Sequence, residues 1–214
     1  ISQEKPDAIL HMTDPHRWSW LYEMEHEIRK EIPILYYHVW DNTPYPTFLK
    51  YVYNSCDWIG CISKLTFECV NEVCPNHHNV EYIPHGVDTN IFTKETTFSK
   101  NNEQKQILGR TYSFVVFLNN ANIPRKQIHE SINSFSKFYE RLTDKEKKNV
   151  LLLIHTDLKT KNGSNLENYV EDVHPSLPVK FSFHKLTEVH LNRLYNLSDL
   201  TINISYNEGF GLTT

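Results

Sequence analysis

Residues 205–214 read Ser-Tyr-Asn-Glu-Gly-Phe-Gly-Leu-Thr-Thr, and the rest of the chain is organised around them. The run 200–204 directly before them alternates as a strand does, and two glycines then break that period. A strand, an acidic residue and a Gly-Phe-Gly turn are how an α/β protein presents backbone N–H groups at a helix start. Such a start carries unsatisfied donors and the positive end of the helix dipole, so it favours an anionic or hydroxyl-rich ligand. Glu208 adds an acceptor for sugar hydroxyls, and the stretch therefore predicts a ligand site.

Upstream of this stretch, short apolar runs alternate with segments of helical periodicity. We expect strands at 7–12, 34–40, 58–63 and 80–84, and again at 113–118, 150–154, 179–183 and 200–204. We expect helices at 16–30, from the 41–46 loop to about 55, and at 64–73, 127–142, 166–173 and 187–197. Because the run 34–40 is apolar throughout, it is expected to be covered on both faces. Repeated βα units with short connections predict parallel sheets with right-handed crossovers.

The repeat is interrupted once. From about residue 86 to 110 the chain is polar, with few candidates for a core and a short helix expected near 104–108. A long irregular insertion inside one compact domain is unusual, so a domain boundary explains it better. We therefore predict two incomplete βα domains, 1–88 and 111–214, joined by a linker at 89–110.

Composition excludes several classes of protein. With 214 residues, 39% of them hydrophobic and 13% aromatic, the chain is expected to fold rather than stay disordered. Its 22 basic and 26 acidic residues give a net charge of −4, which provides no basic field for nucleic acid. No apolar run approaches the roughly 20 residues of a membrane span, and the first residues do not form a signal peptide. We expect a cytoplasmic protein, for which peripheral contact with a membrane stays open.

Four cysteines, at positions 56, 61, 69 and 74, lie within 19 positions of one another. Their spacing lacks the paired x2 steps of a zinc ribbon or finger. Small buried thiols in a reducing compartment are the preferred interpretation, with a metal site or a disulfide as the alternatives.

The loop Asn119–Lys126 reads Asn-Asn-Ala-Asn-Ile-Pro-Arg-Lys and joins a predicted strand to a predicted helix. Ligands of parallel α/β sheets bind beyond the carboxyl ends of the strands, so the loop is well placed for one. Arg125 offers a bidentate fork to a phosphate, and Lys126 offers a mobile point charge. The alternative is a solvated surface pair. The position after a strand, with Glu208 farther along the same sheet, favours phosphate binding.

Three segments resemble one known family. Ser-x-x-Glu-Gly-Phe-Gly-Leu at 205–212 is similar to the first half of the Glu-x7-Glu signature of the retaining GT-B glycosyltransferases of family four (glycosyl transferases group 1). Ile-Pro-His-Gly-Val-Asp at 83–88 resembles the segment that leads into that family's linker, and 124–126 resembles its diphosphate-binding loop. The family's second Glu falls two residues beyond Thr214, so we expect an internal fragment of a longer protein.

The resemblance implies a GT-B fold, in which two Rossmann-like domains face a cleft. It implies transfer of a sugar from a nucleotide-sugar donor to a glycan, lipid or protein acceptor, with retention of configuration. Lys126 takes the family's Lys position, whereas the family's Arg falls near Asn120, so that Arg125 is the substitute. Glu208 is expected to hold the sugar hydroxyls, with the amides of Gly209, Phe210 and Gly211 beside the donor.

The resemblance also implies a role for His38, which ends an apolar strand and would contact the sugar or phosphate from the first domain. The alternative is that His38, one of 12 histidines, is a core or surface residue. In the 83–88 segment, Gly86 is expected to permit a turn with positive φ and Asp88 to fix that turn through backbone N–H groups. Ser63 is expected to cap the helix that follows it.

No metal or cofactor is expected, because the chain contains no Asp-x-Asp motif and the nucleotide-sugar is itself a substrate. No P-loop or Gly-x-Gly-x-x-Gly motif is present either, which argues against a kinase, an ATPase or a dehydrogenase. Two alternatives stay open. A sugar-nucleotide epimerase would share the GT-B scaffold, and a non-catalytic module would bind nucleotide or glycan without turnover.

Overall fold

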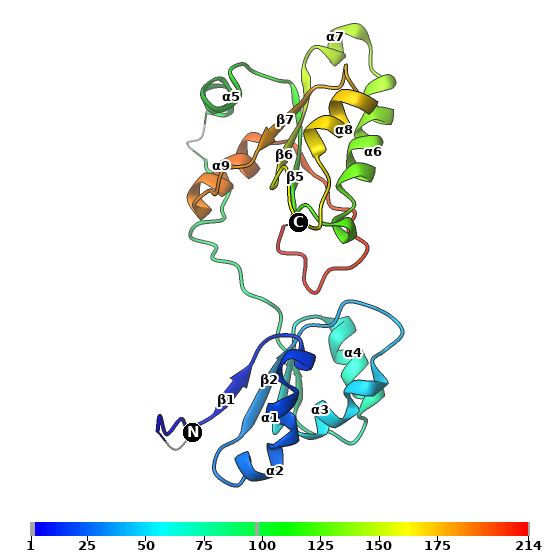
Figure 1. Cartoon of the computed structure of the whole chain (residues 1–214). Helices are drawn as coiled ribbons and strands as arrows, with labels where there is room; N and C mark the ends of the chain where they lie inside the picture. Colours follow the sequence, from blue (N-terminus) through cyan, green and yellow to red (C-terminus); the bar gives the residue numbers. More distant parts are fainter. Residues whose placement is uncertain (1–2, 97–98, 214) are drawn as a thin grey trace. The chain divides into compact units, whose positions relative to one another are not determined.

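The computed structural model describes residues 3–96 and 99–213, and within them the chain forms two compact units. The first unit comprises the residues up to Gly86 together with Asn207–Gly211, and the second comprises Val87–Tyr206 with the residues from Leu212 onward. Within the described residues each unit contains one four-stranded parallel sheet (Figure 1). The predicted α/β class with two parallel sheets is therefore confirmed.

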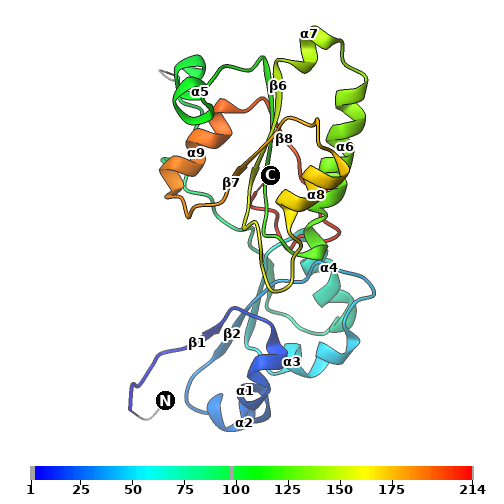
Figure 2. The same cartoon turned by 45° about the horizontal axis from the view of Figure 1, so that its top comes forward.

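The first sheet has the strand order β1-β2-β3-β4, and every neighbouring pair is parallel. Its strands are β1 (Ile9–His11), β2 (Ile34–His38), β3 (Trp58–Cys61) and β4 (Val80–Tyr82). Its helices are η1 (Pro15–Trp18), α1 (Ser19–Glu23), α2 (Glu25–Ile28), η2 (Thr47–Leu49), α3 (Lys50–Asn54) and α4 (Lys64–Val73). Figures 1 and 2 show α1–α4 on one side of this sheet.

The apolar run at 34–40 was expected to be covered on both faces, and this expectation is wrong. Ile34, Tyr36 and His38 are buried, whereas Leu35 and Tyr37 between them are partly exposed. The strand alternates because the helices of this unit pack on one face. All five residues of β2 are large, so the sequence pattern hides the alternation.

The helix expected at 16–30 is divided into η1, α1 and α2, with a break at Met24. The helix expected at 64–73 has these bounds in the structure as α4. Ser63 caps it as predicted, because its Oγ accepts a hydrogen bond from the N–H of Thr66 at 3.1 Å.

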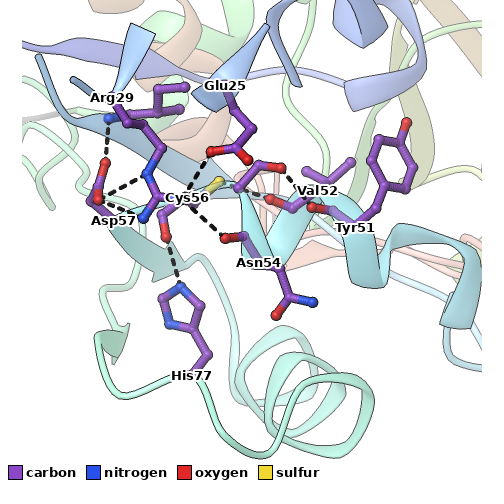
Figure 3. A network of polar contacts seen from close by, with 10 residues as sticks. Glu25, Arg29, Tyr51, Val52, Asn54, Cys56, Asp57 and His77 are labelled. Atoms are coloured by element: carbon purple, nitrogen blue, oxygen red, sulfur yellow. Dashed lines mark hydrogen bonds and ion pairs between the residues drawn. The ribbon is translucent and has the colours of Figure 1, made fainter. Parts of the chain in front are cut away.

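A polar network joins the amino-terminal ends of β2 and β3 to α2 (Figure 3). The guanidinium of Arg29 donates two hydrogen bonds to Asp57 Oδ1, at 3.1 and 2.9 Å, and one to Glu25 at 3.0 Å. The other carboxylate oxygen of Asp57 accepts the N–H of Ile34 at 2.9 Å. Burial by itself would raise the pKa of Asp57, but the hydrogen bonds from Arg29 and from Ile34 outweigh burial, so the pKa is lowered. This cluster fixes the start of two strands, at the opposite end from their carboxyl edge.

The second sheet has the order β7-β6-β5-β8, again with parallel neighbours. Its strands are β5 (Phe114–Asn119), β6 (Val150–His155), β7 (Val179–Ser182) and β8 (Leu200–Thr201). Its helices are α5 (Lys100–Leu108), η3 (Pro124–Lys126), α6 (Ile128–Glu140), α7 (Asp144–Lys147), α8 (Leu166–Val173) and α9 (Glu188–Leu197).

Helices cover both faces of the second sheet, with α6 and α8 on one face and α5 and α9 on the other (Figures 1 and 2). Two apolar clusters fill the layers. Val116, Leu118, Leu152 and Ile154 pack with α6 and α8, and Val115, Phe117, Leu151 and Leu153 pack with α5 and α9. Because β5 and β6 are buried on both faces, their apolar runs read as continuous.

Three elements differ from expectation in this unit. α5 is longer than the helix expected near 104–108, and α7 was not predicted, although Thr143 and Glu146 form a capping box at its start. β8 ends at Thr201 instead of continuing to residue 204.

Two predictions about turn chemistry have different outcomes. Asp88 Oδ1 accepts the N–H of Asn90 at 2.9 Å, as expected for a residue that fixes a turn. Gly86 does not have a positive φ; among the described glycines, positive φ occurs at Gly109 and Gly211. The expectation for Gly86 is therefore wrong.

The four cysteines are free and buried, as expected for the thiols themselves. Burial raises the pKa of the Cys56 and Cys61 thiols to about 12, so that these thiols stay protonated. In the described parts of the chain, no cluster of three or more His, Cys, Asp or Glu side chains could hold a metal ion. Likewise, none of the helices described is long and apolar enough to cross a membrane.

Candidate functional site

The second sheet brings two sequence motifs together at its carboxyl edge. β5 and β8 are neighbouring parallel strands, so the loops that follow them leave from the same edge. The N–H of Tyr206 donates a hydrogen bond to the carbonyl oxygen of Arg125 at 3.0 Å. This bond joins the turn Pro124–Lys126 after β5, which we call the basic turn, to the segment that leads from β8 to Glu208. The two bonded residues are 81 positions apart in the sequence. We call the parts of these two loops that belong to the second unit, residues 119–127, 202–206 and 212–213, the edge site.

The basic turn is preorganised by its backbone. Pro124 opens the 3-10 turn η3, and Gln127 then adopts a left-handed conformation with φ 53° before α6 begins. No side chain caps α6, so its first N–H groups keep their donor capacity. The side chains of Arg125 and Lys126 are both half-buried at this helix start. Two cations beside the positive end of a helix dipole favour a bound anion.

Asn120 bridges the two loops of the edge site. Its side chain is 5% exposed, its Nδ2 donates to Asn203 Oδ1 at 3.4 Å, and its Oδ1 accepts from Thr213 Oγ1 at 3.5 Å. Asn203 Oδ1 also accepts the N–H of Ser205 at 3.2 Å. Asn120 thus uses both ends of its amide to hold the second loop against β5.

The stretch with the two glycines is irregular. Over the described residues 202–213 no helix begins, so the helix start expected at Gly-Phe-Gly is not formed there. Glu208 is half-buried, Phe210 is 40% exposed, and Gly211 has φ 84°, a conformation that favours glycine. Residues 207–211 group with the first unit, where a Cβ on Gly209 would lie 2.5 Å from Val39 Cγ1. Gly209 is therefore needed for this close approach.

His38 lies in the core of the first unit and is 1% exposed. Its Nδ1 is 2.8 Å from the Tyr36 hydroxyl and its Nε2 is 2.8 Å from the Tyr53 hydroxyl. Burial, with a smaller effect of neighbouring His11, lowers the pKa of His38 to about 3. The imidazole is consequently neutral at physiological pH and has both nitrogens engaged. This geometry is that of the core histidine given as the alternative above.

Asn122 and the β6–α8 loop were not singled out from the sequence. The side chain of Asn122 is 3% exposed, and its Nδ2 lies 2.9, 3.2 and 2.8 Å from the carbonyl oxygens of Asp157, Leu158 and Ser164. Thr160 Oγ1 donates to the carbonyl of Asn122 at 2.8 Å. One asparagine thus folds a whole loop against the basic turn. Its position between a strand and a helix start was the available signal, but its partners lie some 35 to 42 positions away.

A pocket of about 360 Å³ lies between this loop and the start of α6. The residues that line it are Asn122, Ile123, Pro124, Gln127, Ile128, His129, Glu130, Asn162, Gly163 and Ser164. Ser164 Oγ lies 2.9 Å from His129 Nε2 across it. The pocket is of a size that holds a small ligand, and Pro124 of the basic turn is part of its lining.

We expect Asn122→Ala to lower the free energy of unfolding of the second unit by about 2–3 kcal/mol, because three carbonyl groups lose their shared donor. All four tryptophans lie in the first unit, so tryptophan fluorescence reports the unfolding of that unit alone. A transition that appears in far-UV circular dichroism but not in tryptophan fluorescence therefore reports the unfolding of the second unit. Urea titration followed by both signals measures the change. The exposed Asn162→Ala is the matched control and should stay within about 0.5 kcal/mol. Equal effects of the two substitutions would contradict the role given to Asn122.

Comparisons with known proteins place the fold. No family model matches the sequence, and no curated protein matches it. Anabaena HepE in complex with UDP-glucose is similar in structure over 92% of this chain and 53% of its own, with TM-score 0.63 and 16% identity. The α,α-trehalose 6-phosphate synthase of Burkholderia multivorans matches over 96% of this chain and 52% of its own, with TM-score 0.67 and 12% identity.

A third solved structure, an E. coli trehalose-6-phosphate protein bound with UDP-2-fluoro glucose, matches over 95% of this chain and 54% of its own, with TM-score 0.67 and 14% identity. The chain thus spans about half the length of the solved structures that it matches. Two parallel sheets and this likeness define the fold as GT-B, which confirms the fold implied by the sequence motifs.

Proposed function

We propose that this chain belongs to a glycosyltransferase that moves a sugar from a nucleotide-sugar donor to an acceptor, with retention of configuration and without a metal. The observation that carries the proposal is the hydrogen bond from Tyr206 N–H to the Arg125 carbonyl, which joins the basic turn to the segment before Glu208. A cationic helix start would suit the phosphates of such a donor, and a carboxylate would suit its sugar hydroxyls. The GT-B fold and the UDP-glucose bound by HepE support the same class of donor.

The following candidate residues each have a part in this proposal. Arg125 and Lys126 neutralise the charge that develops on the leaving diphosphate, which is electrostatic stabilisation of the transition state. Glu208 accepts hydrogen bonds from the sugar hydroxyls, and the amides of residues 209–211 lie beside the donor. Asn120 acts by holding the second loop of the site against β5.

We assign His38 to the core of the first unit instead of to the donor. A contact with the sugar would require it to leave two tyrosine hydroxyls and to expose a ring that is 1% exposed. Each hydrogen bond given up would cost roughly 0.5–1.5 kcal/mol. Tyr36 would keep its bond to the carbonyl of Thr13, and Tyr53 its contact with Cys69 Sγ.

Incubation with UDP-glucose, with and without candidate acceptors, tests the proposed reaction. Acceptor-dependent release of UDP is expected, with the α-anomeric configuration kept in the product by NMR and with rates unchanged in EDTA. An epimerase would change the sugar without an acceptor, and a non-catalytic module would bind UDP-glucose without turnover. Inversion of the anomeric carbon, or loss of the rate in EDTA, would contradict the corresponding part of the proposal.

We expect Lys126→Ala to weaken the binding of UDP by about 1–3 kcal/mol, the range for losing a charge-assisted hydrogen bond. Isothermal titration with UDP measures it. Lys137→Ala removes the same charge from an exposed position on α6 and should leave the affinity within about 0.5 kcal/mol. Unchanged affinity in Lys126→Ala would return Arg125 and Lys126 to solvated surface charges.

A further inference from the structure

Tyr195 on α9 touches both the core and the end of the second loop. Its ring packs edge-on against Phe117 of β5, with centroids 5.0 Å apart at 88°. Its hydroxyl accepts a hydrogen bond from Asn119 Nδ2 at 3.1 Å and donates one to the carbonyl oxygen of Thr213 at 3.1 Å. Burial raises the pKa of Tyr195, with Asn119 opposing, so the hydroxyl keeps its proton at neutral pH. It is therefore a permanent donor to Thr213.

The chain from Tyr206 to Thr213 is hydrogen-bonded to the second unit at both of its ends. Where it begins, Tyr206 N–H donates to the Arg125 carbonyl at 3.0 Å. Where it ends, Thr213 accepts from Tyr195, and Thr213 Oγ1 donates to Asn120 at 3.5 Å. Between the anchors lie Glu208 and both glycines, in a stretch without helix or strand. A stretch without helix or strand has no ladder of backbone hydrogen bonds, so the bonds at its two ends contribute to holding it in one conformation.

We propose that Tyr195 is a positioning residue for donor binding. Its hydroxyl, bonded to Asn119 at the end of β5, holds the Glu208–Gly211 stretch in the conformation that receives the sugar of a nucleotide-sugar. This inference rests on the donor site proposed above, but it names a residue outside every motif discussed there. Losing the hydroxyl removes the bond to the Thr213 carbonyl, and part of the binding energy is then spent on ordering the stretch.

The ring and the hydroxyl of Tyr195 can be tested separately. Tyr195→Phe keeps the packing against Phe117 and removes both hydrogen bonds. The matched control is Tyr37→Phe in the first unit, which removes a hydroxyl that donates to the carbonyl of Ile83 at 3.0 Å. Both substitutions delete one tyrosine hydroxyl that donates to a backbone carbonyl, and Tyr195→Phe also removes the bond from Asn119.

The first readout is limited proteolysis with chymotrypsin, analysed by intact mass. Tyr206, Phe210 and Leu212 are all exposed, so cleavage after them reports how firmly the loop is held. We expect cleavage in this loop to be about tenfold faster in Tyr195→Phe than in the wild type, and unchanged in Tyr37→Phe. Asn119→Ala, which removes the support of the hydroxyl but leaves the tyrosine, should give an increase of about threefold. If Tyr195→Phe does not fold, the cleavage rate of Asn119→Ala decides whether the Tyr195 hydroxyl holds the loop. Cleavage rates within twofold of the wild type overturn the proposal.

The second readout is the affinity for UDP and for UDP-glucose by isothermal titration. Tyr195→Phe should weaken UDP-glucose about tenfold and UDP less than threefold, because Arg125 and Lys126 stay in place. Equal weakening of both ligands would mean that Tyr195 supports the basic turn, and would overturn the proposal. If the wild type binds neither ligand, the proposed function fails, while the proteolysis experiment still decides whether Tyr195 anchors the loop.

Discussion

Glu208→Gln is expected to reduce turnover of the nucleotide-sugar by about 100-fold, which corresponds to about 2.7 kcal/mol of transition-state stabilisation. Gln keeps the size of the side chain and one acceptor oxygen, but it loses the charge. A carboxylate that accepts hydrogen bonds from sugar hydroxyls strengthens them as charge develops at the anomeric carbon, and an amide does so much less. Release of UDP from UDP-glucose in the presence of an acceptor measures the effect.

The alternative for Glu208 is an acid that serves only the stability of the chain, at about 0.3–1 kcal/mol. It predicts normal turnover in Glu208→Gln. Glu140→Gln, at the exposed end of α6, makes the same change of charge and should leave turnover unchanged. Affinities separate the roles further: Glu208→Gln should weaken UDP-glucose but not UDP, whereas Lys126→Ala should weaken both. Normal turnover in Glu208→Gln would remove the proposed mechanism, because no other carboxylate was assigned to the sugar.

Features that depend on neighbouring residues could be predicted from the sequence. Ser63 and Thr187 each cap a helix through the N–H three residues later, so the starts of α4 and α9 are encoded within one turn. The strands β5 and β6 were predicted closely, because they are buried on both faces and their composition alone marks them. The basic turn could likewise be located, since Pro124 and the two cations follow a strand directly.

Features that depend on distant partners could not be predicted. Whether His38 faces a core or a ligand depends on which side of the first sheet the helices cover, and β2 carries large residues on both sides. Asn122 takes its importance from carbonyl groups in a loop far along the chain, and Tyr195 takes its importance from Thr213. An asparagine or a tyrosine has no local signature for such roles, because the spacing of the partners is set by the topology of the sheet.

The buried histidines of the first unit predict a loss of stability in acid. His11 and His38 are 5% and 1% exposed, and burial lowers the pKa of both. Asp14 opposes the shift at His11, whereas His11 adds to the shift at His38. The two imidazoles belong to one aromatic stack, in which His11 lies on Tyr36 at 5.0 Å and Tyr36 on His38 at 4.8 Å. A proton on either ring would put an unpaired charge inside this stack.

The direction follows from proton linkage. The unfolded chain binds a proton at His38 with a pKa of 6.5, while the folded unit binds one only near pH 3. Between these values the unfolded state carries more protons, so the free energy of unfolding falls as pH decreases, by up to about 1.4 kcal/mol per pH unit for this residue. Above pH 6.5 the contribution is complete and constant. At pH 4.5 we expect His38 alone to have lowered the free energy of unfolding of the first unit by about 3 kcal/mol.

Urea unfolding followed by tryptophan fluorescence at several pH values between 7.5 and 4.5 measures this loss in the first unit, which contains all four tryptophans. His38→Gln keeps a donor and an acceptor near Tyr36 and Tyr53 but cannot titrate. It should be less stable than the wild type at pH 7.5. Between pH 6.5 and 4.5, however, its free energy of unfolding should fall less steeply with decreasing pH, by close to the 1.4 kcal/mol per pH unit that one proton contributes. His78→Gln, at an exposed position of the same unit, should keep the wild-type slope. A His38→Gln slope equal to that of the wild type would mean that the ring takes up a proton in the folded unit. His38 would then be open to solvent, and a contact with the donor sugar would again be the better assignment.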